Sequence, residues 1–290
     1  MTHCYLLAMR TYNQTPLKTE QKIISLYNSG LSSVQIQQKL GINPTTILYI
    51  VKRNGFSTRT TKQTSKRYTF NERFFERINT EEKAYWLGFI LADGCISRGK
   101  DIIIVLKKED RKHLEKFIEN INGNNKIQEI KNNGGFNGID AVRLAIRSQK
   151  MYNDLIKCGI TERKSLTAKV PSCIPENFIR HFWRGLVDGD GHICVVNTQS
   201  NGHKYTHLEV GLCGTKNVVY EFENYTKRHI NTIAKIRPDK MIWRFSIGGK
   251  ENAIQLCSLL YDDSVVSLDR KLKIYEQYKQ INVVNPRHPS

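Results

Sequence analysis

The strongest constraint on this chain is a stretch of sequence that occurs twice. Residues 84–96 read AYWLGFILADGCI, and residues 181–193 read HFWRGLVDGDGHI. Both copies contain a Trp, a Gly two places later, two bulky apolar residues, and then a small residue followed by Asp-Gly. Equivalent positions lie 97 residues apart, as in Trp86 with Trp183 and Asp93 with Asp190. The chain therefore contains two related halves and a further segment before them.

The order of predicted elements is also repeated. The first half comprises residues 75–170 and begins with a helix that Thr80 caps and that ends at Gly94. Strands are expected at 101–107, 126–130 and 139–148, and further helices at 109–121 and 150–158. In the second half, residues 171–290, a helix is expected from Glu176 to Gly191, strands at 192–198, 205–213, 231–236 and 241–247, and helices at 216–229 and 250–261. Each half is predicted to form a four-stranded antiparallel sheet with helices over one face, which is an α+β fold.

Alternation along two strands indicates which face of each sheet is buried. Residues 140–148 place Val142, Leu144 and Ile146 on one face and two arginines on the other. Residues 241–247 alternate in the same way, with Met241, Trp243, Phe245 and Ile247 expected on the core face. The opposite, cationic faces are candidate DNA-binding surfaces, and they carry Arg143, Arg147 and Arg244.

Residues 1–56 are predicted to contain a compact three-helix module. Thr19 can cap a first helix over 20–28. Ser32 or Ser33 can cap a second helix, whose Val34, Ile36 and Leu40 are expected to face inward. Asn43-Pro44 begins a third helix that ends near Gly55. Short helices joined by Gly turns resemble a helix-turn-helix, whose third helix enters the major groove of DNA. Its candidate DNA-contacting residues are Thr45, Thr46, Tyr49, Lys52 and Arg53. The alternative is a small helical packing module.

Residues 57–74 are predicted to be a basic linker. Residues 57–70 contain four cations, no acid and no apolar periodicity. Such a segment either follows the phosphate backbone or is a solvated tether, and both interpretations remain open. Its candidate DNA-binding residues are Arg59, Lys62, Lys66 and Arg67.

The charge of the chain identifies the class of its partner. The sequence has 45 Lys and Arg against 27 Asp and Glu, a formal net charge of +18. Nucleic acid is the expected partner, because no long apolar run indicates a membrane. The seven cysteines form no Cys-x-x-Cys pair and are expected to be reduced, and the N-terminal apolar run is too short for a signal peptide. We therefore expect an intracellular protein, in a bacterial or phage-infected cell or an organelle, that is not secreted.

The repeated stretch combines close packing with a pair of acids. Gly88 and Ala92 are four residues apart, as are Gly185 and Gly189, so each helix carries small residues on one face. If these faces pack together, Asp93 and Asp190 meet at the helix ends, where two carboxylates repel unless a cation neutralises them. Oxygen ligands favour Mg²⁺, with Mn²⁺ as a substitute, and this arrangement in a basic protein indicates metal-assisted phosphodiester hydrolysis. The alternative is that Asp-Gly is only a helix-ending turn, a coincidence that two matching copies make improbable.

Both stretches resemble the LAGLIDADG motif of homing endonucleases in their single-chain, two-motif form, over about residues 75–282. The resemblance implies two pseudo-symmetric αββαββα halves that form a saddle over DNA, and a double-strand cut that leaves 3′ overhangs. It also implies that Asp93 and Asp190 hold metal, assisted by the carbonyls of Ala92 and Gly189, and that Lys164 and Lys271 lie beside the scissile phosphates. The implied partner is double-stranded DNA with a long asymmetric target site, bound by a monomer.

The sequence departs from the motif at several positions. Leu91 replaces its first acid, whereas Asp188 keeps it, and that acid is expected to be structural. Trp86, Leu87, Trp183 and Arg184 differ at the start of the motif, where packing alone is affected. An intein is not expected from the ends of the sequence. An RNA maturase that assists splicing of intron RNA, and a DNA-binding regulator that does not cleave, remain alternatives.

Overall fold

The computed structural model describes residues 15–58, 68–131, 140–200 and 203–284, and the predicted linker residues Arg59, Lys62, Lys66 and Arg67 lie outside these ranges. The chain divides into two compact units, residues 1–67 and 68–290. None of the described helices is long and apolar enough to cross a membrane. The functions assigned to the predicted domain ranges stay predictions.

The described part of the first unit contains helices α1 (Leu17–Asn28), α2 (Ser33–Leu40) and α3 (Pro44–Arg53). Ser32 and Gln35 form a capping box at the start of α2, and the Asn43 side chain accepts a hydrogen bond from Thr45 N at the start of α3. The core comprises Ile23, Tyr27, Ile36, Ile47, Ile50 and Val51. The structure therefore contains the three predicted helices, while a helix-turn-helix function stays a prediction.

Two details of this unit differ from the prediction. The first helix begins after Pro16 rather than at a Thr19 cap, because Pro is well tolerated at a helix start. Val34, predicted to face inward, has 54% of its surface exposed, since Ile36 fills the inward position of the short second helix.

The second unit repeats one α+β arrangement. Its first half contains α5 (Glu81–Ala92), β1 (Gly94–Ser97), β2 (Asp101–Lys107), α6 (Arg111–Asn120), β3 (Gln128–Ile130), β4 (Ala141–Arg147) and α7 (Gln149–Lys157). Its second half contains α8 (Ile179–Asp190), β5 (Gly191–Ser200), β6 (His203–Gly214), α9 (Lys216–His229), β7 (Lys235–Asp239), β8 (Ile242–Gly249) and α10 (Asn252–Tyr261), followed by α11 (Asp269–Val284). The described strands form two antiparallel four-stranded sheets of equivalent order, β1-β2-β4-β3 and β5-β6-β8-β7, which confirms the predicted α+β fold class.

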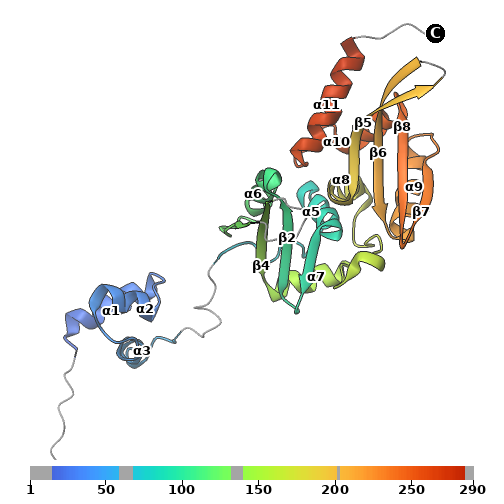
Figure 1. Ribbon diagram of the computed structural model, residues 1–290. Helices are drawn as coiled ribbons and strands as arrows, with labels where there is room; N and C mark the ends of the chain where they lie inside the picture. Colours follow the sequence, from blue (N-terminus) through green and yellow to red (C-terminus); the bar gives the residue numbers. More distant parts are fainter. Residues whose placement is uncertain (1–14, 59–67, 132–139, 201–202, 285–290) are drawn as a thin grey trace, which may run out of the picture. The chain divides into compact units, whose positions relative to one another are not determined.

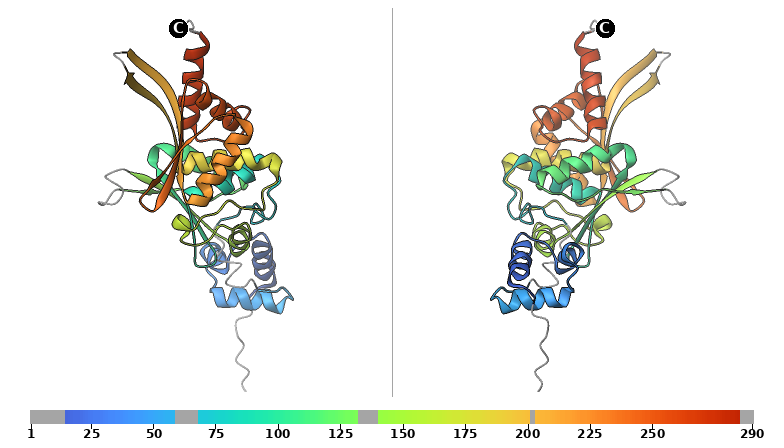
Figure 2. Two further views of the ribbon diagram at one scale, coloured as in Figure 1. Left: turned by 90° about the vertical axis from the view of Figure 1, so that its right-hand side faces the viewer. Right: turned by 90° about the vertical axis from the view of Figure 1, so that its left-hand side faces the viewer.

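Helices cover one face of each sheet, and α5 and α8 lie side by side between the two sheets (Figure 1). In Figure 2 the helices gather on one side of the sheets, so that the opposite faces are open. The predicted alternation of β4 is confirmed, because Val142, Leu144 and Ile146 are buried while Arg147 is exposed. One continuous apolar core contains residues from both halves, which makes the helix pair part of a shared interior.

Several predicted boundaries were wrong or incomplete. β1 was not predicted, because four residues are too few to show a clear alternation. The predicted strand over 231–236 instead forms at Lys235–Asp239, where Pro238 is tolerated because β7 is a sheet edge. Met241 precedes β8 and is 73% exposed, so it does not belong to the core face with Phe245 and Ile247. The C-terminal helix α11 was also missed.

The helix pair generates a prediction about stability. A Cβ atom at Gly185 would lie 2.0 Å from Tyr85 O, and one at Gly88 would lie 2.1 Å from Phe182 O. Gly185→Ala should therefore destabilise the second unit by at least about 1–3 kcal/mol, since backbone atoms cannot move aside as a flexible side chain can. Thermal unfolding followed by tryptophan fluorescence measures this, because the three Trp residues all lie within 68–290.

Gly214→Ala is the matched control for this experiment. A Cβ atom there would meet only the side chain of Val218, at 3.3 Å for the nearest atom, so a much smaller loss is expected. Equal effects of the two substitutions would contradict a backbone contact between α5 and α8.

Candidate active site at the helix pair

The contact between α5 and α8 places the two motif acids at one end of the helix pair. Gly88 lies against the backbone of Phe182, and Gly185 lies against the backbone of Tyr85. At the end of the helices a Cβ atom on Gly189 would lie 2.3 Å from Ala92 Cβ and 3.5 Å from a carboxylate oxygen of Asp93. The small residues therefore let Asp93 approach the end of the helix that carries Asp190.

The environment of the two acids is unfavourable to negative charge. Burial raises the pKa of Asp93 from 3.8 to about 6, and the neighbouring charge of Asp190 contributes to the rise, while Lys271 and Lys164 oppose it. Burial also raises the pKa of Asp190, again opposed by Lys164 and Lys271. Both acids lie at helix C-termini, where the helix dipole adds negative potential. The pair is thus arranged to attract a cation.

Two lysines supply positive charge beside the acids, the partly buried Lys164 and the buried Lys271. Lys164 Nζ donates to Ala92 O at 3.1 Å and to Gly94 O at 2.6 Å. Lys271 Nζ donates to the carbonyl oxygens of Val187, Asp188 and Gly191, at 2.7, 2.8 and 2.6 Å respectively. Burial lowers the pKa of both lysines, that of Lys271 to about 8. Each lysine therefore binds the carbonyls at the end of the motif helix in its own half.

The second-copy acid Asp188 belongs to a buried network rather than to the acid pair. Its carboxylate accepts hydrogen bonds from Tyr85 Oη and Tyr261 Oη, both at 2.7 Å, and from Leu268 N at 2.8 Å. Burial raises the pKa of Asp188, while the charge of Lys271 and these donors oppose the rise. The network ties the first half, through Tyr85, to the segment that leads into Lys271.

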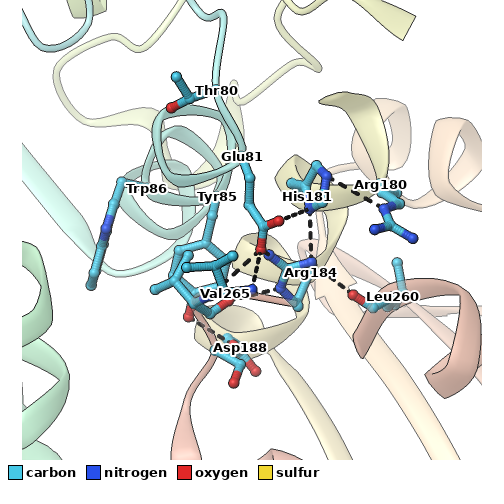
Figure 3. A network of polar contacts seen from close by, with 12 residues as sticks. Thr80, Glu81, Tyr85, Trp86, Arg180, His181, Arg184, Asp188, Leu260 and Val265 are labelled. Carbon is cyan, nitrogen blue, oxygen red and sulfur yellow. Dashed lines mark hydrogen bonds and ion pairs between the residues drawn. The ribbon is translucent and has the colours of Figure 1, made fainter. Parts of the chain in front are cut away.

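An ion pair between Glu81 and Arg184 also joins the two halves. Figure 3 shows Glu81 of α5 beside Arg184 of α8, with Glu81 Oε1 2.5 Å from Arg184 Nη2. The same carboxylate accepts from Val265 N at 2.7 Å, and Arg184 donates to Val266 O and Leu260 O at 2.9 and 2.8 Å. Sequence reasoning assigned only packing to Arg184, since its partner Glu81 is 103 residues away and carries no motif signal.

The candidate DNA-binding residues occupy accessible positions, and several already have partners. On α3, Thr45, Thr46, Tyr49, Lys52 and Arg53 are all exposed, and Arg53 also pairs with Glu20 of α1. On the open face of the first sheet, Arg143 donates to Gln128 at 3.0 Å, and Arg147 lies 3.4 Å from Asp101. On the second sheet, Arg244 Nε lies 2.5 Å from Asp239. These residues lie far from the acids in sequence, and their roles stay predictions.

The donor atoms at the acid pair suit a hard divalent cation. The carboxylates of Asp93 and Asp190 have raised pKa values, and the backbone carbonyl of Ala92 lies beside them and already accepts from Lys164. Carboxylate and carbonyl oxygens are the ligands that Mg²⁺ prefers. The residues present therefore fit such an ion, and the sharing of the Ala92 carbonyl with a lysine was not predicted.

No sequence profile of a protein family and no curated protein matches the chain. Solved structures do match. The chain is similar in structure to LAGLIDADG homing endonucleases. The LAGLIDADG meganuclease I-AabMI bound to uncleaved DNA has 14% identity and a TM-score of 0.47, with 69% of this chain and 90% of that chain covered. I-CpaMI bound to uncleaved DNA has 15% identity and a TM-score of 0.48 over the same shares. I-SmaMI bound to cleaved DNA has 13% identity and a TM-score of 0.48, covering 72% and 90%.

The raised pKa of Asp93 predicts how stability depends on pH when divalent cations are removed. An acid with a pKa of about 6 in the folded state and 3.8 when unfolded holds its proton more tightly in the folded protein. Stability should therefore fall as pH rises from about 4 to above 6, by no more than about 1 kcal/mol, because solvent screens the charge of an exposed carboxylate. Asp93→Asn should remove this loss, which unfolding followed by tryptophan fluorescence in EDTA measures.

Asp140→Asn provides the control, because it removes one carboxylate of the same unit that lies outside the acid pair. Its pH profile should parallel that of the wild type. If the Asp93→Asn profile is also parallel, then the folded protein does not disfavour ionised Asp93.

Proposed function

We propose that this chain is a site-specific, double-strand DNA endonuclease of the LAGLIDADG homing type, which uses a divalent cation held by Asp93 and Asp190. The observation that carries the proposal is the convergence of the two repeated Asp residues at adjacent helix ends, with a lysine bound to the carbonyls of each end. A helix-ending turn needs neither a second acid beside it nor a lysine partner. The net charge of +18 supports a polyanionic substrate.

Each group at the acid pair has a distinct task in this proposal. Asp93 and Asp190 hold the cation, with the Ala92 and Gly189 carbonyls as further oxygen donors. A bound Mg²⁺ or Mn²⁺ supplies activation of water and stabilisation of the leaving oxygen. The fold places one acid and one lysine in each half, so the pair can address the two strands of a duplex. The resemblance to the family implies cleavage that leaves 3′ overhangs.

The two lysines differ in how they can assist. An ammonium group has three donors. Lys271 Nζ uses three on described carbonyl oxygens, whereas Lys164 Nζ uses two. Lys164 therefore retains a donor for a phosphate oxygen, while Lys271 acts on the developing charge from a fixed position. Both stabilise negative charge near the bond that breaks.

Replacement of either acid should separate cleavage from binding. Asp93→Asn and Asp190→Asn keep the side-chain shape but remove the charge that holds the cation. Cleavage should fall by more than the roughly 10- to 100-fold typical of residues that only support a metal ligand, while DNA affinity in EDTA stays near wild type. Target sites are first selected from a randomised DNA library, and then the rate of nicking is measured with Mg²⁺ or Mn²⁺.

Two outcomes would contradict the proposal. If the wild-type protein binds its selected site and never nicks it with either ion, the chain is a DNA-binding regulator. If both Asn variants cleave at the wild-type rate, the acid pair is not the metal site.

The three-helix unit is proposed to extend the DNA contact. Deletion of residues 1–67 should weaken binding and reduce its salt dependence without removing the acid pair, because that deletion removes only the first compact unit. Within the unit, Lys52→Ala on α3 should lower the slope of log affinity against log salt by about 1. Lys22→Ala, an equally exposed cation on α1, is the matched control. Equal effects of the two substitutions would contradict recognition through α3.

A further inference from the structure

A second group of metal-ligand side chains lies on the open face of the second sheet. His192 and Cys194 of β5 and Glu209 of β6 present one donor atom each, and these atoms all lie within 4.8 Å of one another. His192 Nε2 lies 3.0 Å from Glu209 Oε1. Within the described part of the chain no acid of the helix pair joins this group, so it is separate from Asp93 and Asp190.

The strand register explains why these side chains converge. His192 pairs with Gly211 and Cys194 pairs with Glu209, so the donors occupy neighbouring positions on one face of two strands. The flanking Ile193, Leu208 and Val210 point into the core on the opposite face. The three donors are therefore fixed on a rigid sheet rather than on a loop (Figure 1).

Gly211 provides the space that the His192 ring occupies, and Gly248 lies beside Glu209. A Cβ atom on Gly211 would lie 2.1 Å from His192 Cε1, so the imidazole ring lies directly over that residue. Gly248 of β8 pairs with Glu209, and a Cβ atom there would lie 3.8 Å from Glu209 Oε2 and 3.2 Å from His207 Nε2. The absence of a side chain at Gly211 thus leaves room for the imidazole ring beside the carboxylate of Glu209.

The first half offers an internal comparison, because its strands have the same register. The positions equivalent to His192, Cys194, Gly211, Glu209 and Gly248 are Cys95, Ser97, Ile103, Asp101 and Arg147. In the first half, Asp101 lies 3.4 Å from Arg147 of β4. Ile103 occupies the position that Gly211 has in the second half. In the second half, Gly248 takes the place of that arginine. Glu209 therefore faces His192 and Cys194 instead.

We propose that His192, Cys194 and Glu209 bind a transition-metal ion of the Zn²⁺ class. Imidazole nitrogen, thiolate sulfur and carboxylate oxygen together form a ligand set typical of Zn²⁺ and unlike the all-oxygen set of Mg²⁺. Donors around one tetrahedral ion lie about 4 Å or less apart, so small side-chain rotations suffice. The thiol proton of Cys194 is released to solvent on binding, and water completes the coordination because the side chains of His192 and Glu209 are 42% and 33% exposed.

Cobalt provides a direct probe of this site. Co²⁺ is titrated into the reduced, full-length Asp93→Asn/Asp190→Asn protein, which lacks the carboxylate pair, and the thiolate-to-cobalt absorption band is recorded. The band should saturate at one ion per chain and disappear on addition of Zn²⁺. Cys194→Ser should abolish it, and His192→Ala should weaken binding by more than about 10- to 100-fold.

Two further variants make the test specific. Cys213→Ser removes another partly buried thiol from β6 and should leave the band unchanged. Gly211→Ala removes no ligand but displaces the His192 ring, so it should weaken Co²⁺ binding. Absence of the band in the parent protein, or its survival in Cys194→Ser, would overturn the proposal. None of these readouts depends on nuclease activity, so their failure is distinct from failure of the proposed function.

Discussion

The backbone contact between α5 and α8 is the constraint on which the rest of the second unit depends. Gly88 and Gly185 each lie where a Cβ atom would overlap a carbonyl oxygen of the other helix. Helices that carry larger residues at their contact are usually 8–10 Å apart. The close approach joins the cores of the two halves and brings two helix C-termini, each with an Asp, to one place. Charge is therefore concentrated there as a direct result of packing.

Two lysines offset this concentration of negative charge. Lys164 and Lys271 bind the carbonyls at the helix ends, and their charges lower the pKa values that burial raises at Asp93 and Asp190. Lys271 lies in the first turn of α11, and two acids hold the segment that leads into this helix. Glu81 accepts from Val265 N, and Asp188 accepts from Leu268 N. The acid pair is thus positioned by one network that spans both halves, and removal of a single member leaves another buried charge uncompensated.

Local patterns in the sequence predicted most of the elements and the contact of the two motif helices, but not the side-chain contacts that join distant segments. The small residues at 88, 92, 185 and 189 predict a close helix contact because spacing alone sets which face they share. Glu81 and Arg184 form a buried ion pair that no local pattern indicates, and Lys164 reaches Ala92 across 72 positions. Short edge elements such as β1 and β7 were missed or displaced, since pairing with a neighbouring strand decides them rather than their own composition.

The two halves share the residues of the helix contact and differ on the open faces. Gly88 and Asp93 of the first half match Gly185 and Asp190 of the second, whereas Ile103 and Arg147 of the first sheet correspond to Gly211 and Gly248 of the second. The glycine positions are fixed by the helix contact, because a larger residue on either helix would overlap the backbone of the other. Open-face positions have no such partner, so each half can acquire its own charges and ligands. The open faces of the two sheets therefore present different side chains, while the helix contact between them keeps the same glycines.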